Sequence, residues 1–310
     1  MKKDFPPISS LFNESWELFK SRLLRLLLFG MIDFGLFVFL ALILGIIAVT
    51  SFIGAAGHNF PYNINWPSLY PFLFGVGGVL LALLILGAIF IGVLAITWQL
   101  LSLNEDPKIS FGTIFRKGFS FFIPVLAVTL LNVLIIIGGF FVFVIPGILF
   151  AIFVSYAQYE VIFDKQRGIN ALRRSYTIIT THFGEIFVRI LLLWGLSFVV
   201  SLIPHLFASR PAAGISGLSF IINILLSWFG LCYYFTLYKQ AKQRTDLTKP
   251  FSILWIWIIA IIGWVILLLI IFFTGMGISQ ALQSGQLPKY FQHPTRHAPL
   301  PPYYRYHNSY

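Results

Sequence analysis

Long apolar runs are the feature of this sequence that most restricts its fold. Because a helix needs about 20 apolar residues to cross a bilayer, the length and context of seven segments favour membrane helices. They lie at approximately residues 26–52, 71–101, 119–144, 148–163, 186–206, 215–238 and 251–274. Backbone polar groups in lipid must bond within a helix or a closed barrel, and the sequence lacks the alternation of strands. We therefore predict an all-α polytopic membrane protein with about seven transmembrane helices.

The composition agrees with a lipid environment. The 310 residues are 58% hydrophobic and 10% charged, whereas soluble proteins average about 45–50% and about 25%. A net charge of +11 would suit nucleic acid, but the lysines and arginines lie in short segments between apolar runs, as expected for residues that orient membrane helices. We therefore expect no nucleic-acid partner. Cys232 is the only cysteine, so an intramolecular disulfide is excluded.

The basic residues are distributed unevenly among the gaps between the apolar segments. Most of them lie in the N-terminal region and in alternate gaps, which predicts that these parts are cytoplasmic. Residues 1–25 are then a cytoplasmic amphipathic segment and not a cleavable signal peptide. Residues 277–310, rich in Pro, Tyr and His, are predicted to form a disordered tail on the outside. We expect a multi-pass protein of the bacterial cytoplasmic (inner) membrane.

The elbow segment, Ile145 to Phe187, carries the most distinctive pattern. It combines a predicted tight hairpin at Pro146–Gly147, an undersized apolar helix and a basic amphipathic stretch near residues 168–182. In that stretch apolar residues recur at spacings of three and four, which favours a helix lying in the membrane interface. A similar stretch near residues 110–121 also precedes an apolar segment.

These similarities predict an internal repeat. The N-terminal segment and the two later amphipathic stretches each precede a pair of apolar segments. We predict three repeats of an interfacial helix plus a helix pair, forming a six-helix membrane domain over residues 26–245, followed by an additional transmembrane helix at 246–276. The alternative is a general constraint on basic linkers in membrane proteins.

A family resemblance rests on three motifs. They are ESWELFKSRL (Glu14 to Leu23), the Tyr159-Glu160 pair after the Pro-Gly motif, and ALRRSY (Ala171 to Tyr176). Over about residues 8–245, the chain resembles bacterial membrane proteins of the YciC-like group and the related membrane domain of glycerophosphodiester phosphodiesterases. The resemblance implies a six-helix bacterial membrane domain. We expect no phosphodiesterase activity, because no catalytic domain accompanies the membrane part in this sequence.

Ionisable residues at membrane depth are the first candidates for function. Asp33 lies eight residues beyond Arg25 and thus deep in the first apolar segment. It is interpreted either as a proton- or cation-linked site or as a polar contact between helices. Gln99, Tyr156 and Glu160 are expected to line the same polar cytoplasmic half.

Arg173 and Arg174 return along the amphipathic stretch that follows Glu160. One interpretation is an ion pair that fixes the elbow segment. The other is a lipid-phosphate site in which the forked donors of the arginines bind phosphate and Glu160 orients them. Both alternatives place a polar site at Glu160.

The sequence indicates no catalytic, cofactor-binding or metal site, and we expect no cofactor. It lacks the glycine-rich phosphate-binding motifs. His293 and His297 are four residues apart, but Pro294 and Pro299 oppose the helix that would bring them together. We predict a non-enzymatic scaffold that organises the envelope or binds anionic headgroups or a membrane-protein partner. The alternative is a transporter or lipid-translocating permease.

Overall fold

The computed structural model describes residues 5–56, 66–106, 109–207 and 213–283. These residues form nine helices and no strand. The helices are α1 (Ile8–Ala56), α2 (Trp66–Asn104), α3 (Phe111–Val142), α4 (Val144–Phe153), α5 (Ala157–Asp164), α6 (Ile169–Thr181), α7 (Phe183–Phe207), α8 (Ala213–Lys242) and α9 (Leu254–Gln283). Seven helical spans are long and apolar enough to cross a membrane, counting α4 and α5 together, which suggests a multi-pass membrane protein and confirms the predicted all-α polytopic fold.

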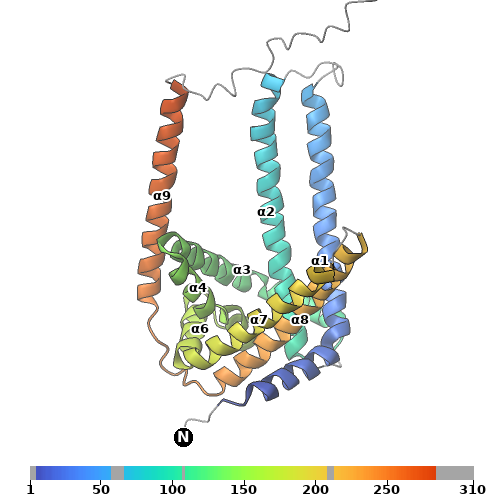
Figure 1. Ribbon diagram of the computed structural model, residues 1–310, viewed down its shortest axis with the longest axis vertical. Coiled ribbons are helices and arrows are strands. Elements are labelled where there is room, and N and C mark those ends of the chain that lie inside the picture. The colour runs from blue at the N-terminus through green and yellow to red at the C-terminus, as the bar shows by residue number, and fades with distance from the viewer. Residues whose placement is uncertain (1–4, 57–65, 107–108, 208–212, 284–310) are drawn as a thin grey trace, which may run out of the picture.

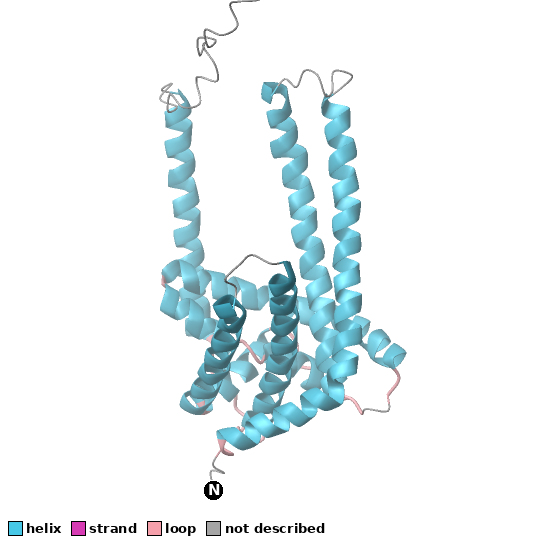
Figure 2. Cartoon of the chain, turned by 45° about the vertical axis from the view of Figure 1, so that its right-hand side comes forward, coloured by secondary structure: helices cyan, strands magenta, loops and turns pink. Residues whose placement is uncertain are grey.

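The helices form a packed lower part from which three long helices extend (Figure 1). Helices α3 to α8 lie in the lower part, while α1, α2 and α9 continue well above it, as both ribbon views show (Figures 1 and 2). Helix α1 packs along α2, and α9 packs against α3. Large apolar side chains on the upper parts of α1, α2 and α9 are exposed, as expected for surfaces that meet lipid acyl chains.

Helix α1 joins two segments that the sequence analysis separated. It runs without interruption from Ile8 to Ala56, and Figures 1 and 2 show its first part crossing the lower end of the molecule before the helix rises. The first part contacts α8, where the Gln240 amide donates to Glu14 at 2.9 Å. Similarly, α3 is one helix over Phe111–Val142 and includes the stretch predicted as an interfacial helix near residues 110–121. Of the two later stretches, only the one near 168–182 forms a separate helix, α6, which ends before His182.

The predicted tight hairpin at Pro146–Gly147 is wrong. The chain changes direction at Phe143, whose backbone is extended, and Pro146 lies in the first turn of α4. Proline is tolerated there because a first-turn N–H has no partner within the helix. Gly147 instead permits close packing against α3, since a Cβ at this position would meet the Phe140 ring at 2.5 Å.

The undersized fourth segment consists of two short helices. The break between α4 and α5 lies at Val154–Tyr156, and Ser175 of α6 satisfies backbone groups on both sides of it. The Ser175 hydroxyl donates to the Phe153 carbonyl at 2.8 Å and accepts from the Tyr156 N–H at 3.1 Å. A break in a membrane-embedded helix requires such partners because lipid cannot supply them.

Of the glycines in the predicted runs, Gly138 and Gly139 lie in close contacts. A Cβ at Gly138 would meet the backbone of Ala260 in α9. Gly75, Gly77 and Gly78 have no atom within 4 Å of a hypothetical Cβ, so they do not serve close packing in the described part of the chain. At the C-terminal end, α9 continues through Gln283 into the predicted tail, and residues 284–310 lie outside the described residues.

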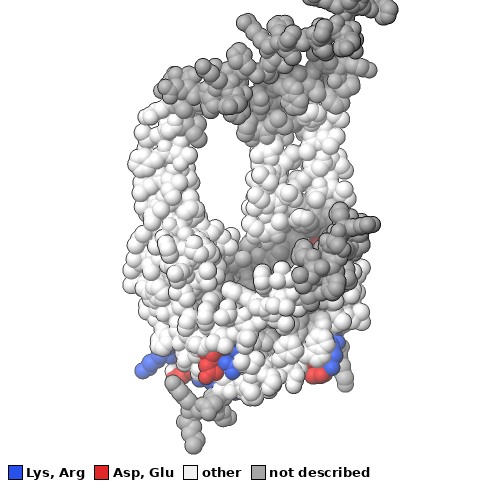
Figure 3. Space-filling view, viewed as in Figure 1, with Lys and Arg blue, Asp and Glu red and all other residues white. Residues whose placement is uncertain are grey.

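Charged side chains gather at one end of the molecule. Figure 3 shows most of the visible Lys, Arg, Asp and Glu side chains at the lower end, while the upper part of that face carries none among the described residues. This segregation follows from the sequence, since the charges lie mainly at the helix ends and connections of the lower end, and the long apolar parts of the helices carry almost none.

Candidate functional site

The Glu160 carboxylate is the centre of a charged network at the lower end. Glu160 lies in α5 and is fully buried. Its Oε2 accepts a hydrogen bond from Arg174 Nε of α6 at 2.5 Å, and its Oε1 accepts from the Tyr238 hydroxyl of α8 at 2.8 Å. Three helices therefore meet at this carboxylate. The structure contains the ion pair that the sequence analysis considered for the elbow segment.

A second carboxylate and a lysine close the network. Asp164 accepts from Arg174 Nη2 at 2.5 Å and also pairs with Lys242 of α8. Lys242 Nζ donates to the Tyr238 hydroxyl at 3.0 Å. The charged junction, defined as Glu160, Asp164, Arg174 and Lys242, thus balances two carboxylates with two cations. Such a closed arrangement satisfies buried charges and favours a structural role.

Arg173 and Tyr156 have different surroundings from Glu160. Arg173 Nη2 donates to the Pro250 carbonyl at 3.4 Å, so the two arginines point to different partners. Tyr156 is fully buried and precedes α5, and its hydroxyl has no hydrogen-bond partner among the described residues. The structure does not bring Arg173 and Arg174 together as one phosphate site, because the donors of Arg174 are already used by carboxylates.

Asp33 and Gln99 are neighbours, as predicted, but they lie apart from the charged junction. The Gln99 amide nitrogen of α2 lies 3.5 Å from Asp33 Oδ2 of α1. Asp33 Oδ1 is buried without a partner in the described part of the chain. This contact between α1 and α2 fits a polar contact between helices. With its amide nitrogen directed to Asp33, Gln99 has its amide oxygen on the side of a neighbouring cavity.

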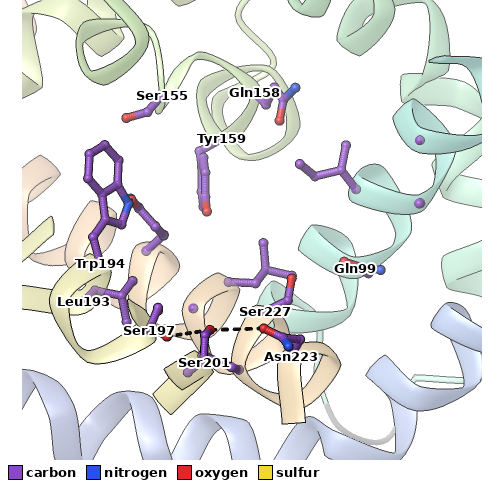
Figure 4. Close-up of a pocket in the computed structure, with 17 residues that line it drawn as sticks. Gln99, Ser155, Gln158, Tyr159, Leu193, Trp194, Ser197, Ser201, Asn223 and Ser227 are labelled. Carbon is purple, nitrogen blue, oxygen red and sulfur yellow. Dashed lines mark hydrogen bonds between the residues drawn. The ribbon is translucent and has the colours of Figure 1, made fainter. Parts of the chain in front are cut away.

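That cavity, which we call the polar cavity, is an open cavity lined by α2, α5, α7, α8 and the α4–α5 break, and it has a volume of about 680 Å³. Figure 4 shows the side chains of its polar residues around one central space. The polar residues of its lining are Gln99, Ser155, Gln158, Tyr159, Trp194, Ser197, Ser201, Asn223, Ser227 and Tyr234. Of the residues expected in the polar cytoplasmic half, Gln99 lines this cavity and Tyr156 and Glu160 do not.

The sequence analysis missed most of this lining. Ser197 and Ser201 are four residues apart on α7, and Asn223 and Ser227 are four residues apart on α8. A spacing of four places two side chains on one helix face, so polar stripes in otherwise apolar segments were the available signal. The Ser201 hydroxyl lies 3.3 Å from Asn223 Oδ1 and connects the two stripes (Figure 4).

A second cavity, which we call the basic cleft, lies between the end of α2, the start of α3 and the α5–α6 connection. Its volume is about 640 Å³, and Lys117, Lys165 and Arg167 line it together with one carboxylate, Glu105. Lys117 pairs with Glu105 at 2.8 Å. Lys165 and Arg167 are exposed and have no ion-pair partner among the described residues.

A groove beside the basic cleft extends its polar surface. Ser110, Thr113 and Arg116 line the groove, and Lys117 and Ser120 line both the groove and the cleft. Arg116 is exposed and forms no ion pair with any described residue. The lower end therefore offers cations to an anionic partner, chiefly from α3 and from the α5–α6 connection.

Within the described ranges, no group of three or more His, Cys, Asp or Glu side chains is arranged to hold a metal ion. His293 and His297 lie outside those ranges. In comparisons with protein-family models, curated proteins and solved structures, no match to this chain was found.

Proposed function

We propose that the protein is a non-enzymatic membrane scaffold that binds anionic lipid headgroups at its basic end, with that end in the bacterial cytoplasm. The observation that carries the proposal is the basic cleft, where three cations face a single carboxylate. On the motifs ESWELFKSRL and ALRRSY we also propose membership of the YciC-like group and its related membrane domain.

The arrangement of charges in the cleft supports phosphate as the partner. Because Lys117 is paired with Glu105, the positive charge of Lys165 and Arg167 is uncompensated within the cleft. Arginine offers forked donors to phosphate and lysine adds a point charge. A cation close to an anionic membrane surface contributes about 1 kcal/mol of binding free energy. We therefore propose a phosphate site at Lys117, Lys165 and Arg167, in place of the site that the sequence suggested at Arg173 and Arg174.

The test compares two double variants that remove the same charge. Lys165→Gln with Arg167→Gln alters the cleft, whereas Lys239→Gln with Lys249→Gln alters exposed lysines outside it. Native mass spectrometry of the purified chain would measure retained phosphatidylglycerol against phosphatidylcholine. If the contributions of Lys165 and Arg167, about 1 kcal/mol each, are additive, the cleft variant weakens phosphatidylglycerol binding about thirtyfold. The control retains most of the binding. Equal losses in both variants, or no loss in the cleft variant, would contradict the proposal.

The polar cavity favours a second candidate function, a transporter or lipid-translocating permease. Transporters place substrate sites in polar cavities beside interrupted helices, and here the α4–α5 break adjoins the cavity. Proteoliposomes distinguish the two functions. A permease moves a solute or lipid in a manner that depends on Gln99, whereas a scaffold shows no flux.

A further inference from the structure

The polar cavity has a lining without formal charge. In the described part of the chain its walls contain amides, hydroxyls, aromatic rings and aliphatic groups, but no Lys, Arg, Asp or Glu. A charged group bound there would meet no opposite charge, whereas an uncharged polar group can exchange hydrogen bonds with the amides and hydroxyls. The cavity therefore selects against ions, including the phosphate expected at the basic cleft, and no residue lines both.

The two glutamines present acceptors to this space. The Gln158 amide nitrogen donates to the Thr129 hydroxyl at 3.0 Å, and the Gln99 amide nitrogen points to Asp33. Figure 4 accordingly shows the oxygen of each glutamine on the cavity side. Neither oxygen accepts a hydrogen bond from any described residue. A ligand that satisfies them must carry O–H or N–H donors.

Tyr159 presents an unbonded hydroxyl to the cavity. Its side chain is 5% exposed and lines the cavity, and its hydroxyl points into the central space in Figure 4. The structure contains no hydrogen bond to this hydroxyl from the described residues, nor one to the Ser227 hydroxyl nearby. Both hydroxyls face the cavity without a partner among the described residues, so each is available to donate to and accept from a bound polar group.

An apolar groove adjoins the cavity. It has a volume of about 470 Å³ and is lined by Phe12, Trp16 and Phe229 with aliphatic residues of α7 and α8. Leu226 lines both the groove and the polar cavity. An amphipathic molecule could therefore place its polar part among the amides and hydroxyls and an acyl chain in the groove.

We propose that the polar cavity binds an uncharged lipid whose headgroup carries several hydroxyl groups, with an acyl chain in the adjoining groove. Hydroxyl groups donate to the Gln99 and Gln158 oxygens and exchange hydrogen bonds with Tyr159 and Ser227. The exposed Trp194 ring offers a surface to the carbon-bound hydrogens of a sugar-like ring. This site does not depend on the anionic-headgroup site, so either proposal can fail alone.

The test uses the full chain in detergent micelles with three probes. They are dioleoyl monoglucosyl diacylglycerol, dioleoylphosphatidylcholine with the same acyl chains, and free methyl glucoside. Native mass spectrometry would measure the lipid retained by the wild type and by Tyr159→Phe and Ser227→Ala. Tyr156→Phe is the matched control, because its hydroxyl is also buried without a partner but lies outside the cavity.

We expect the wild type to retain the glucosyl lipid in preference to phosphatidylcholine. Each cavity variant should bind the glucosyl lipid about fivefold more weakly, as for the loss of one net hydrogen bond. Tyr156→Phe should retain it fully. Ser227 is exposed and its hydroxyl is unbonded within the described residues, so Ser227→Ala should fold normally. Equal retention of the two lipids would overturn the proposal, as would unchanged binding in both variants. Displacement by methyl glucoside at similar affinity would show a soluble ligand and would also overturn it.

Discussion

At the scale of single residues, Glu160 shows how the lower end is stabilised. Its carboxylate is removed from solvent yet bonded to Arg174 and Tyr238. A buried charge with partners on two other helices fixes their relative positions, because leaving any one charge unpaired is costly. We interpret the charged junction as a structural element first.

Glu160→Gln should lower the free energy of unfolding by about 3 kcal/mol, the lower end of the range for a broken buried pair. The loss is limited because Arg174 keeps Asp164 as a partner. Glu17→Gln is the control, since Glu17 is 71% exposed and pairs with Lys20 only at the surface. It should change stability by less than about 0.5 kcal/mol. Unfolding in mixed micelles measures both, and equal effects would contradict the structural role of Glu160.

The sequence could predict only part of this junction. Glu160 and Arg174 are close in the chain, and the return of a basic segment after an acidic one suggested their pairing. Tyr238 and Lys242 come from α8, far along the chain. Their participation depends on how α8 packs, which local spacing does not encode. The same reason explains why the different partners of Arg173 and Arg174 were not predicted.

At the scale of helices, the contact between α3 and α9 depends on small residues. A Cβ at Gly263 would overlap the Gly138 carbonyl, and Trp264 donates to the Leu134 carbonyl at 2.9 Å. Small residues allow helices to approach closely in membranes, where no hydrophobic effect drives them together. This contact attaches α9 to α3.

Gly263→Val should destabilise the α3–α9 contact by about 1–3 kcal/mol, because a branched side chain must displace backbone. Gly275→Val is the matched control on the same helix, since a Cβ there has no neighbour within 4 Å. It should change stability by less than about 0.5 kcal/mol. Micelle unfolding monitored by circular dichroism would compare them. Similar stabilities would show that the close approach is not required.

Helix existence was predictable here, whereas helix interruption was not. Apolar length, together with context for the undersized fourth segment, identified all seven spans. The break at Val154–Tyr156 has no proline or glycine to announce it and relies on Ser175 from another helix. Conversely, no local signal separates the amphipathic start of α3 from its apolar remainder, and Pro124 lies within the helix. Contacts with other helices, and not the local sequence, therefore determine where α4 ends and why α3 continues.

At the scale of the whole molecule, the gathering of charges at one end predicts topology. Reporter fusions after Asp106, Lys165 and Arg244 should report the cytoplasm, because basic connections are retained there. A fusion after Gln283, at the end of α9, should report the outside. A cytoplasmic signal at Gln283 would contradict a chain with seven crossings.

The global distribution of polar groups was harder to read from the sequence. Charges mark the lower end clearly, but the polar cavity is formed by isolated serines, amides and aromatic residues from four parts of the chain. Each such residue is common in membrane helices. Only their convergence in space distinguishes a site from ordinary helix contacts.

The charged junction has a consequence for the response to voltage. Its two carboxylates and two cations carry no net charge together. Moving a charge through the membrane field requires about 2.3 kcal/mol per 100 mV, but a shift of this neutral group along the membrane normal requires no net electrical work. A change in membrane potential should therefore leave the joint between α5, α6 and α8 unaffected.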